Sequence, residues 1–211
     1  MKAERSLEIM RVVWLKHDLR LADHAPLMEA VAHGDDLLLL YVVEPERLDQ
    51  PDESMLHVAW DLANARTLLA RVEALGGTMH IRTGRPEQVL RNLQGTSAIV
   101  SLHSHEETGF QWSWERDKRV MAWCEANDTV WHEHPWNGVV RRLTDRDRWN
   151  SIRNRRMVEP VLEAPARLPS HSNLTCVDET KGVFPCYNDL VKTPLEAGER
   201  AAHAWLDSCL L

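Results

Sequence analysis

The sequence VVWLKHDLRLADHAPL at residues 12–27 decides the fold. An apolar run from Met10 to Leu15 ends abruptly in a charged loop, and Pro26 then begins a helix-like segment. A short apolar run that leads into a charged loop and then into a helix is typical of a buried parallel strand. The stretch therefore predicts a central strand whose carboxyl end opens into that loop.

Strand-like and helix-like segments alternate along the first two thirds of the chain. Predicted strands cover residues 10–15, 37–43, 78–82, 98–102 and 129–132, and predicted helices cover residues 26–33, 57–75, 86–93 and 114–126. This alternation indicates right-handed βαβ units and a parallel sheet covered on both faces. We predict an α/β, Rossmann-like fold with a five-stranded parallel sheet in the order 3-2-1-4-5, helices on both faces and an extended carboxyl-terminal tail.

The composition changes after Val140. Residues 141–156 carry seven arginines and two acids, and residues 159–192 are rich in Pro, Ser, Asn and Thr without periodicity, as in a linker. A new amphipathic helix then begins at Gly198 with little sequence left to pack against, so we expect this tail to be poorly anchored. The predicted domains are an α/β domain at 1–143, a basic segment and linker at 144–197, and the beginning of a second domain at 198–211.

The overall composition predicts a folded protein without a membrane span. Hydrophobic residues make up 44% of the chain, but no apolar run approaches the roughly 20 residues of a membrane helix. The amino terminus lacks the apolar core of a signal peptide. The four cysteines form no CxxC pair, which argues against a disulfide framework and favours a reducing cytoplasm. The net charge of −7 argues against indiscriminate nucleic-acid binding.

Several motifs resemble the amino-terminal domain of the DNA photolyase/cryptochrome family. The signature V-W-F/L-x-x-D-L-R-L-x-D-x-x-x-L is matched by Trp14, Asp18, Leu19, Arg20, Leu21, Asp23 and Leu27. Residues 104–117 are similar to the segment after the fourth strand in a bacterial branch of the family, and residues 157–168 are similar to the interdomain linker of that branch. The resemblance covers about the whole chain.

This resemblance implies a light-harvesting, or antenna, domain. In the family, such domains hold a folate, a deazaflavin or a flavin, whereas FAD and the DNA lesion are bound by a separate helical domain. The residues after Gly198 are too few for the FAD-binding or lesion-binding motifs. Because light-driven repair requires that FAD, we expect this chain to be non-catalytic by itself. The implied partners are the helical domain and, only through the full-length protein, DNA. Self-association through the helix at 198–211 is the alternative.

The predicted topology places a binding site where the strand order reverses, beyond the carboxyl ends of the first and fourth strands. The two loops at that point, residues 16–25 and 103–110, also carry family motifs. Candidate cofactor anchors are His17, Asp18, Arg20, Ser104, His105 and Glu106, with Trp14 or Trp112 as a stacking wall.

The anchors also have structural alternatives. Asp18 and Arg20 can form an ion pair that fixes the loop and caps the next helix, while Glu106 and Glu107 can cap the helix that follows them. Residues 141–156 can contact phosphate, but a solvated helix or a docking surface for the helical domain is the favoured interpretation.

Two His-x-His pairs raise the question of a metal site. His103 with His105 and His132 with His134 each place two imidazoles on one face of an extended segment, which metals can use. Because no cysteine or carboxylate completes either set convincingly in the sequence, we predict no metal site.

A stand-alone nucleotide-binding or protein-interaction domain, similar to universal stress proteins, is the second candidate function. It predicts a glycine-rich phosphate loop after the fourth strand. The chain instead has SHEETG at residues 104–109, whose paired carboxylates repel phosphate. The antenna interpretation is therefore favoured.

Overall fold

The computed structural model describes residues 9–34, 36–136 and 138–210. Its first part consists of β1 (Ile9–Leu15), α1 (Ala25–Ala32), β2 (Leu37–Val43), α2 (Pro45–Leu48), α3 (Met55–Ala74), β3 (Met79–Thr83), α4 (Pro86–Gln94), β4 (Ala98–His105), α5 (Gln111–Ala126) and β5 (Val130–His134). A 3-10 turn (Arg146–Arg148), α6 (Trp149–Met157), β6 (Val177–Asp178), α7 (Tyr187–Leu190) and α8 (Glu199–Cys209) follow.

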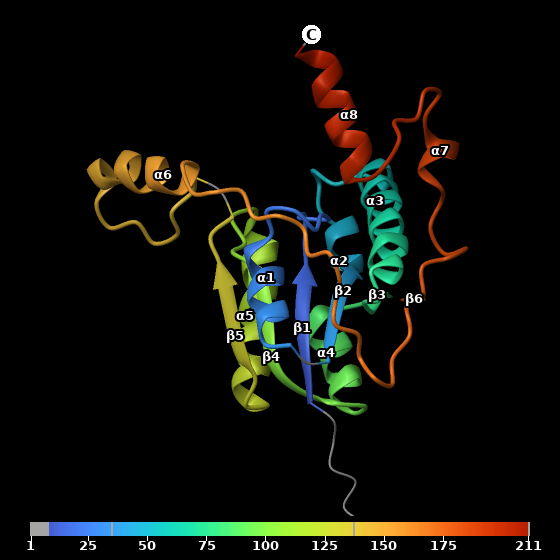
Figure 1. Ribbon diagram of the computed structural model, residues 1–211, viewed down its shortest axis with the longest axis horizontal. Helices are drawn as coiled ribbons and strands as arrows, with labels where there is room; N and C mark the ends of the chain where they lie inside the picture. Colours follow the sequence, from blue (N-terminus) through green and yellow to red (C-terminus); the bar gives the residue numbers. More distant parts are fainter. Residues whose placement is uncertain (1–8, 35, 137, 211) are drawn as a thin grey trace, which may run out of the picture.

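The strands form one parallel sheet in the order β5-β4-β1-β2-β3-β6 (Figure 1). The first five strands lie in the predicted order, but the predicted count of five is wrong. The sixth strand, β6, pairs with the outer edge of β3 at His80 and Ile81. It was missed because two residues within a segment rich in Pro, Ser, Asn and Thr carry no strand periodicity, and its position depends on the open edge of β3.

Alternate residues of the central strand enter two separate cores. Val13 and Leu15 pack on one face of the sheet with residues of α1 and α3. Val12 and Trp14 pack on the opposite face with residues of α4 and α5. Because helices cover both faces, most positions of β1 and all of β2 are buried, which explains the largely apolar runs in the sequence.

The segment around residues 168–180 is docked on the α/β domain, contrary to the expectation of a poorly anchored tail. Leu168 is 1% exposed, and its N–H donates to the carbonyl of Leu75 at 3.0 Å. A Cβ at Gly77 would approach the Leu168 Cβ within 2.8 Å, so glycine makes room for this contact. Arg66 binds the Asp178 carboxylate at 2.9 Å. The division of the chain at residue 143 stays a prediction.

We expect trypsin to cleave after Lys192 well before it cleaves after Arg167. Lys192 and Arg167 are both exposed. Cleavage after Arg167 requires the neighbouring Leu168 side chain to leave the core, whereas cleavage after Lys192 requires no such local unfolding. A time course followed by mass spectrometry checks the order. Equal rates at the two sites would show that residues 168–180 are not docked in solution.

Helix α8 projects beyond the carboxyl ends of the strands (Figure 1). Its apolar side chains are largely uncovered, with Trp205 65% and Leu206 52% exposed. An uncovered apolar face of this kind indicates a contact surface for another domain or chain. Like every other helix of the described residues, α8 is too short or too polar to cross a membrane.

Candidate functional site

Asp18 joins the ends of the two central strands to the beginning of α1. It lies in the loop that follows β1, and its Oδ1 accepts a hydrogen bond from the Lys16 N–H at 2.7 Å. Its Oδ2 lies 2.5 Å from His105 Nδ1 at the end of β4 and 3.0 Å from His24 Nε2. All three side chains are buried. The sequence prediction that the loops after β1 and β4 meet is therefore confirmed for Asp18 and His105.

His24 fixes the orientation of this group because its ring also caps α1. His24 Nδ1 accepts a hydrogen bond from the Leu27 N–H at 3.1 Å, so in the neutral ring Nε2 carries the hydrogen that faces Asp18. Burial would raise the pKa of Asp18, but the contacts with His105 and His24 outweigh it and hold that pKa well below its usual range. Asp18 is thus a buried carboxylate whose charge is stabilised within the protein.

Arg20 ties its own loop together through the backbone. Its guanidinium donates to the carbonyl of Ala22 at 3.1 Å and to that of Asp23 at 2.8 Å. The Asp18–Arg20 ion pair considered as an alternative is not formed, because the Asp18 carboxylate faces the two imidazoles instead.

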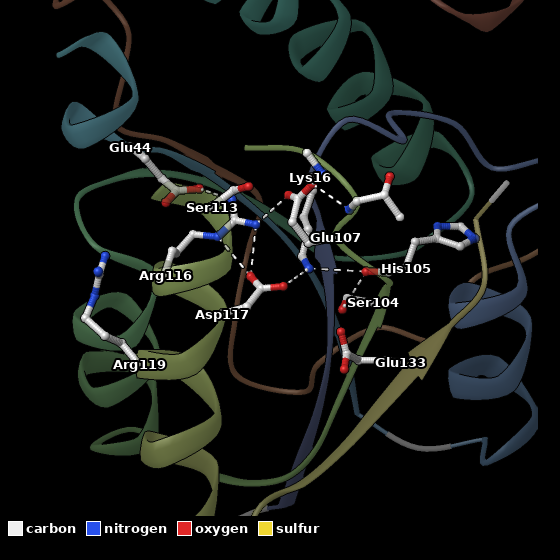
Figure 2. Close-up of polar contacts among 12 residues, drawn as sticks. Lys16, Glu44, Ser104, His105, Glu107, Ser113, Arg116, Asp117, Arg119 and Glu133 are labelled. Carbon is white, nitrogen blue, oxygen red and sulfur yellow. Dashed lines mark hydrogen bonds and ion pairs between the residues drawn. The ribbon is translucent and has the colours of Figure 1, made fainter. Parts of the chain in front are cut away.

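A buried group of charged side chains lies beyond the ends of β1, β2 and β4 (Figure 2). At its centre, Arg116 of α5 is 2% exposed and contacts Glu44 at 2.8 Å, Glu107 at 2.7 Å and Asp117 at 2.9 Å. Lys16 contacts Asp117 at 3.1 Å. Two cations thus face three carboxylates away from water. We call Lys16, Glu44, Glu107, Arg116 and Asp117 the buried charge cluster.

Burial and ion pairing shift the pKa of each group in this cluster in opposite directions, and the net direction differs between groups. Burial lowers the pKa of Lys16, with Asp117 opposing the shift. Burial also raises the pKa of Glu44 despite the neighbouring Arg116. For Glu107, the attraction of Arg116 and Lys16 outweighs burial and keeps its pKa lowered. The cluster depends most on Arg116, because this one guanidinium serves all three carboxylates.

The aromatic candidates belong largely to the protein interior. Trp14 is 1% exposed, and its ring lies 4.5 Å from Lys16 Nζ and 4.9 Å from the Arg116 guanidinium carbon. These are cation–π distances, so Trp14 supports the buried charge cluster. Trp112 lines a cavity of about 20 Å³ next to Arg116, which has room for about one water molecule.

Ser104, near the end of β4, contacts a neighbouring side chain, whereas Glu106, just after β4, is held through its backbone and has a buried Oε2 with no hydrogen-bond partner among the described residues. Ser104 is buried, and its Oγ accepts a hydrogen bond from Trp131 Nε1 at 3.1 Å. The backbone N–H of Glu106 donates to the carbonyl of His134. The Glu107 carboxylate accepts the N–H groups at residues 108 and 109, so it closes the turn before α5 rather than capping the helix itself.

The remaining candidates line an open groove of about 650 Å³. His17, Asp18 and Arg20 of the β1–α1 loop form one wall, and residues of α3 and α8, among them Trp60 and Leu206, form the others. His17 is exposed and stacks on Trp136, with the ring centroids 6.4 Å apart. The structure therefore brings His17 and Arg20 together at a surface that a ligand can reach, while Asp18, Ser104 and His105 are buried.

Glu199 completes the groove and was missed by the sequence prediction. Its carboxylate accepts hydrogen bonds from the N–H groups of Leu21 at 3.2 Å and Ala22 at 3.0 Å, which fixes the beginning of α8 on the β1–α1 loop. Gly198 has a φ of +105°, and a Cβ there would lie 2.5 Å from Thr67 Cγ2. The sequence marked Gly198 as a helix start, but nothing local indicated where that helix docks.

Most of the chain matches a known protein family. The sequence profile of the DNA photolyase family matches residues 11–145. Cryptochrome DASH of Gloeobacter violaceus is 26% identical over 206 residues, which are 90% of this chain and 40% of that protein. A deoxyribodipyrimidine photo-lyase of Thermus thermophilus is 34% identical over 102 residues, 46% of this chain and 23% of that protein.

Solved structures share the fold over nearly the whole chain. A Synechocystis cryptochrome superposes with a TM-score of 0.76 at 18% identity, covering 96% of this chain and 46% of that one. A class III photolyase of Agrobacterium tumefaciens gives a TM-score of 0.76 at 19% identity, covering 98% and 46%. A Sulfolobus tokodaii photolyase, described with two FAD molecules and a novel light-harvesting cofactor, gives 0.64 at 17% identity, covering 93% and 45%. The chain thus spans less than half the length of these relatives.

Proposed function

The chain belongs to the DNA photolyase family, and from that premise we propose that it acts as the amino-terminal antenna domain of a photolyase- or cryptochrome-like protein. The observation that carries this proposal is the open groove walled by the loop with the family signature. An antenna transfers excitation energy through space and changes no bond. It therefore requires an apolar slot with a few polar anchors, and the groove supplies both.

We place the chromophore, a folate, a deazaflavin or a flavin, in this groove. The volume of about 650 Å³ lies within the roughly 300–1,000 Å³ typical of small-molecule sites. Trp60 and Leu206 offer apolar surface, and His17 and Arg20 offer polar contacts. The light-harvesting cofactor described for the Sulfolobus relative supports a flavin as one candidate. Phosphate or carboxylate groups of these chromophores would be recognised by Arg20.

The 211 residues are proposed to have no repair activity by themselves. They span 46% of the solved cryptochrome and class III photolyase chains, and light-driven electron transfer needs a flavin held against the lesion. We assign that flavin to a helical region that packs on the exposed apolar face of α8, and we assign DNA contact to the complete protein. Pairing of α8 with a second copy is the competing arrangement. A cytoplasmic location is part of the same proposal.

Titration of the purified chain with FAD and with 5,10-methenyltetrahydrofolate tests the assignment. We expect at least one of them to bind at one site, seen as a change in its fluorescence. Arg20→Ala should weaken that binding by about 1.5 kcal/mol, because a hydrogen bond to a charged group of the ligand is lost. This change corresponds to a little over tenfold in affinity.

Arg85→Ala is the matched control, since Arg85 pairs with Glu46 and lies outside the groove. Thermal unfolding of Arg20→Ala separates loss of a ligand contact from loosening of the loop that Arg20 ties together. Equal affinities for the Arg20 and Arg85 variants would contradict the assignment to this groove, and no binding of either compound would contradict a folate or FAD as its chromophore. In the same samples, illumination with an oligonucleotide containing a cyclobutane dimer should leave the dimer intact.

A further inference from the structure

A group of histidines surrounds one carboxylate on the α1 side of β4 and β5. Glu29 of α1 places its Oε2 2.6 Å from His134 Nε2 and 3.2 Å from His103 Nδ1. Its Oε1 lies 3.1 Å from His132 Nδ1. Glu29 is the carboxylate that the two His-x-His pairs lacked in the sequence, since it lies 74 residues before His103. Three imidazole nitrogens from two neighbouring strands therefore converge on one carboxylate.

We propose that Glu29, His103 and His134 bind a divalent transition-metal ion of the zinc class, with His132 packed beside them. The ligand atoms of Glu29, His103 and His134 all lie within 4.8 Å of one another, a spacing that one ion can bridge with small side-chain movements. The His103 and His132 rings are stacked, with centroids 4.6 Å apart and an interplanar angle of 8°. His132 lies outside this three-residue set and packs beside it, with its Nδ1 3.1 Å from Glu29 Oε1. We call these four residues the histidine–glutamate site.

The ligand types select the class of metal. Imidazole nitrogens with one carboxylate suit Zn²⁺, Co²⁺ and Ni²⁺, whereas Ca²⁺ and Mg²⁺ prefer sites made of oxygen ligands. The site also contains no thiolate or thioether of the kind that selects Cu(I). Zinc sites with histidine and carboxylate ligands commonly have three protein ligands and a water in the fourth position, and Glu29, His103 and His134 can supply the three.

A second contact orients the ligand that is most deeply buried. His103 is fully buried, and its Nε2 lies 2.9 Å from Ser101 Oγ while its Nδ1 faces Glu29. Metal-binding histidines usually use their other ring nitrogen for such a hydrogen bond, which fixes the ring and its tautomer. Ser101 is therefore a positioning residue for His103.

A metal ion can reach the histidine–glutamate site from solvent, and the Glu29 carboxylate is paired there with histidines. Glu29, His132 and His134 are partly exposed, so an ion can enter from solvent. Among the residues that the structure describes, the ion-pair partners of Glu29 are these three histidines and include no lysine or arginine. A bound cation would join α1 to β5, the edge strand of the sheet, and would stabilise the folded state.

Isothermal titration of the untagged, chelator-treated chain with Zn²⁺ tests the proposal. Cys186 and Cys209 are exposed thiols, so all samples carry Cys186→Ser and Cys209→Ser to remove competing ligands. We expect one equivalent of Zn²⁺ to bind and to raise the unfolding temperature. We also expect Co²⁺ to give the visible absorption of a site with nitrogen and oxygen ligands.

The variants distinguish this site from binding elsewhere. Ser101→Ala should weaken Zn²⁺ binding by roughly 10- to 100-fold, as is typical when the contact that orients a ligand is lost. The double variant His132→Ala/His134→Ala should lose more Zn²⁺ affinity than Ser101→Ala. His57→Ala, at an exposed histidine on α3, should leave Zn²⁺ affinity unchanged. Glu29→Gln provides a conservative second variant, and circular dichroism without metal verifies that each variant is folded. Undiminished binding in the double variant, or no binding to the parent chain, would overturn the proposal.

Discussion

Arg116→Met is expected to lower the free energy of unfolding by about 3–5 kcal/mol, the range measured when one partner of a buried ion pair is removed. Methionine keeps much of the volume of arginine, so the loss arises chiefly from charge. Glu44, Glu107 and Asp117 would stay buried with Lys16 as the only cation of the buried charge cluster. Urea unfolding, followed by circular dichroism, measures the loss.

Arg119→Met is the matched control on the same helix. The Arg119 guanidinium contacts Glu46 and Glu87, but its side chain is 35% exposed. Exposed ion pairs of this kind contribute about 1 kcal/mol or less. The loss of stability in Arg116→Lys should lie between those of Arg116→Met and Arg119→Met, because one ammonium cannot contact all three carboxylates. If the Arg116 and Arg119 variants lose equal stability, the carboxylates are not held in the buried arrangement described here.

Asp18→Asn is expected to destabilise the protein by about 2–4 kcal/mol at pH 7. The amide can still accept the Lys16 N–H, but its NH₂ group would face His105 Nδ1, which donates to the carboxylate in the native protein. His105 would have to change tautomer, and the buried Nε2 of His24 would lose the charge that it faces. Thermal and urea unfolding of both proteins measure the cost.

The pH dependence of this cost has a definite sign. Because the pKa of Asp18 is held well below its usual range in the folded state, the carboxylate contributes its full stability above the unfolded pKa of about 3.9. That contribution is lost as the pH falls through the lower folded pKa. The difference between native chain and variant should therefore be constant near neutrality and shrink below about pH 4.

Asp23→Asn serves as the control in the same loop. Asp23 is exposed and has a φ of 49°, which asparagine tolerates as well as aspartate does. We expect the free energy of unfolding of the Asp23→Asn variant to stay within about 0.5 kcal/mol of the native value. A cost for Asp18→Asn no larger than that of Asp23→Asn would mean that the Asp18 carboxylate does not join the two strands.

Local sequence pattern was enough to predict the central sheet because each strand carries its own signal. The apolar run at residues 37–43 predicts β2 with its observed bounds, and the alternation of strand-like and helix-like segments predicts a parallel sheet. β6 has no such signal, since its two residues become a strand only by pairing with β3. The sequence likewise gives no sign that Leu168 is more than a linker residue, because its buried position depends on the space left by Gly77.

The candidate site shows the same division between local and distant information. The meeting of Asp18 with His105 follows from topology, because both lie at the ends of adjacent strands. The partners of Arg116 could not be predicted, since Glu44 lies 72 residues away and reaches it only across the ends of the sheet. Glu29 was missed for the same reason. Long-range pairs of charged residues carry no periodicity that a single sequence reveals.

The short strand β6 also bears on the solubility of the protein. An uncovered edge strand offers a row of backbone N–H and C=O groups to any other chain and so promotes aggregation. β6 occupies that row at His80 and Ile81, and the ion pair between Arg82 and Glu179 places charge at the end of the same edge. The segment that joins the α/β domain to α8 therefore also covers part of the β3 edge, one of the two sides at which the first five strands could pair with another chain.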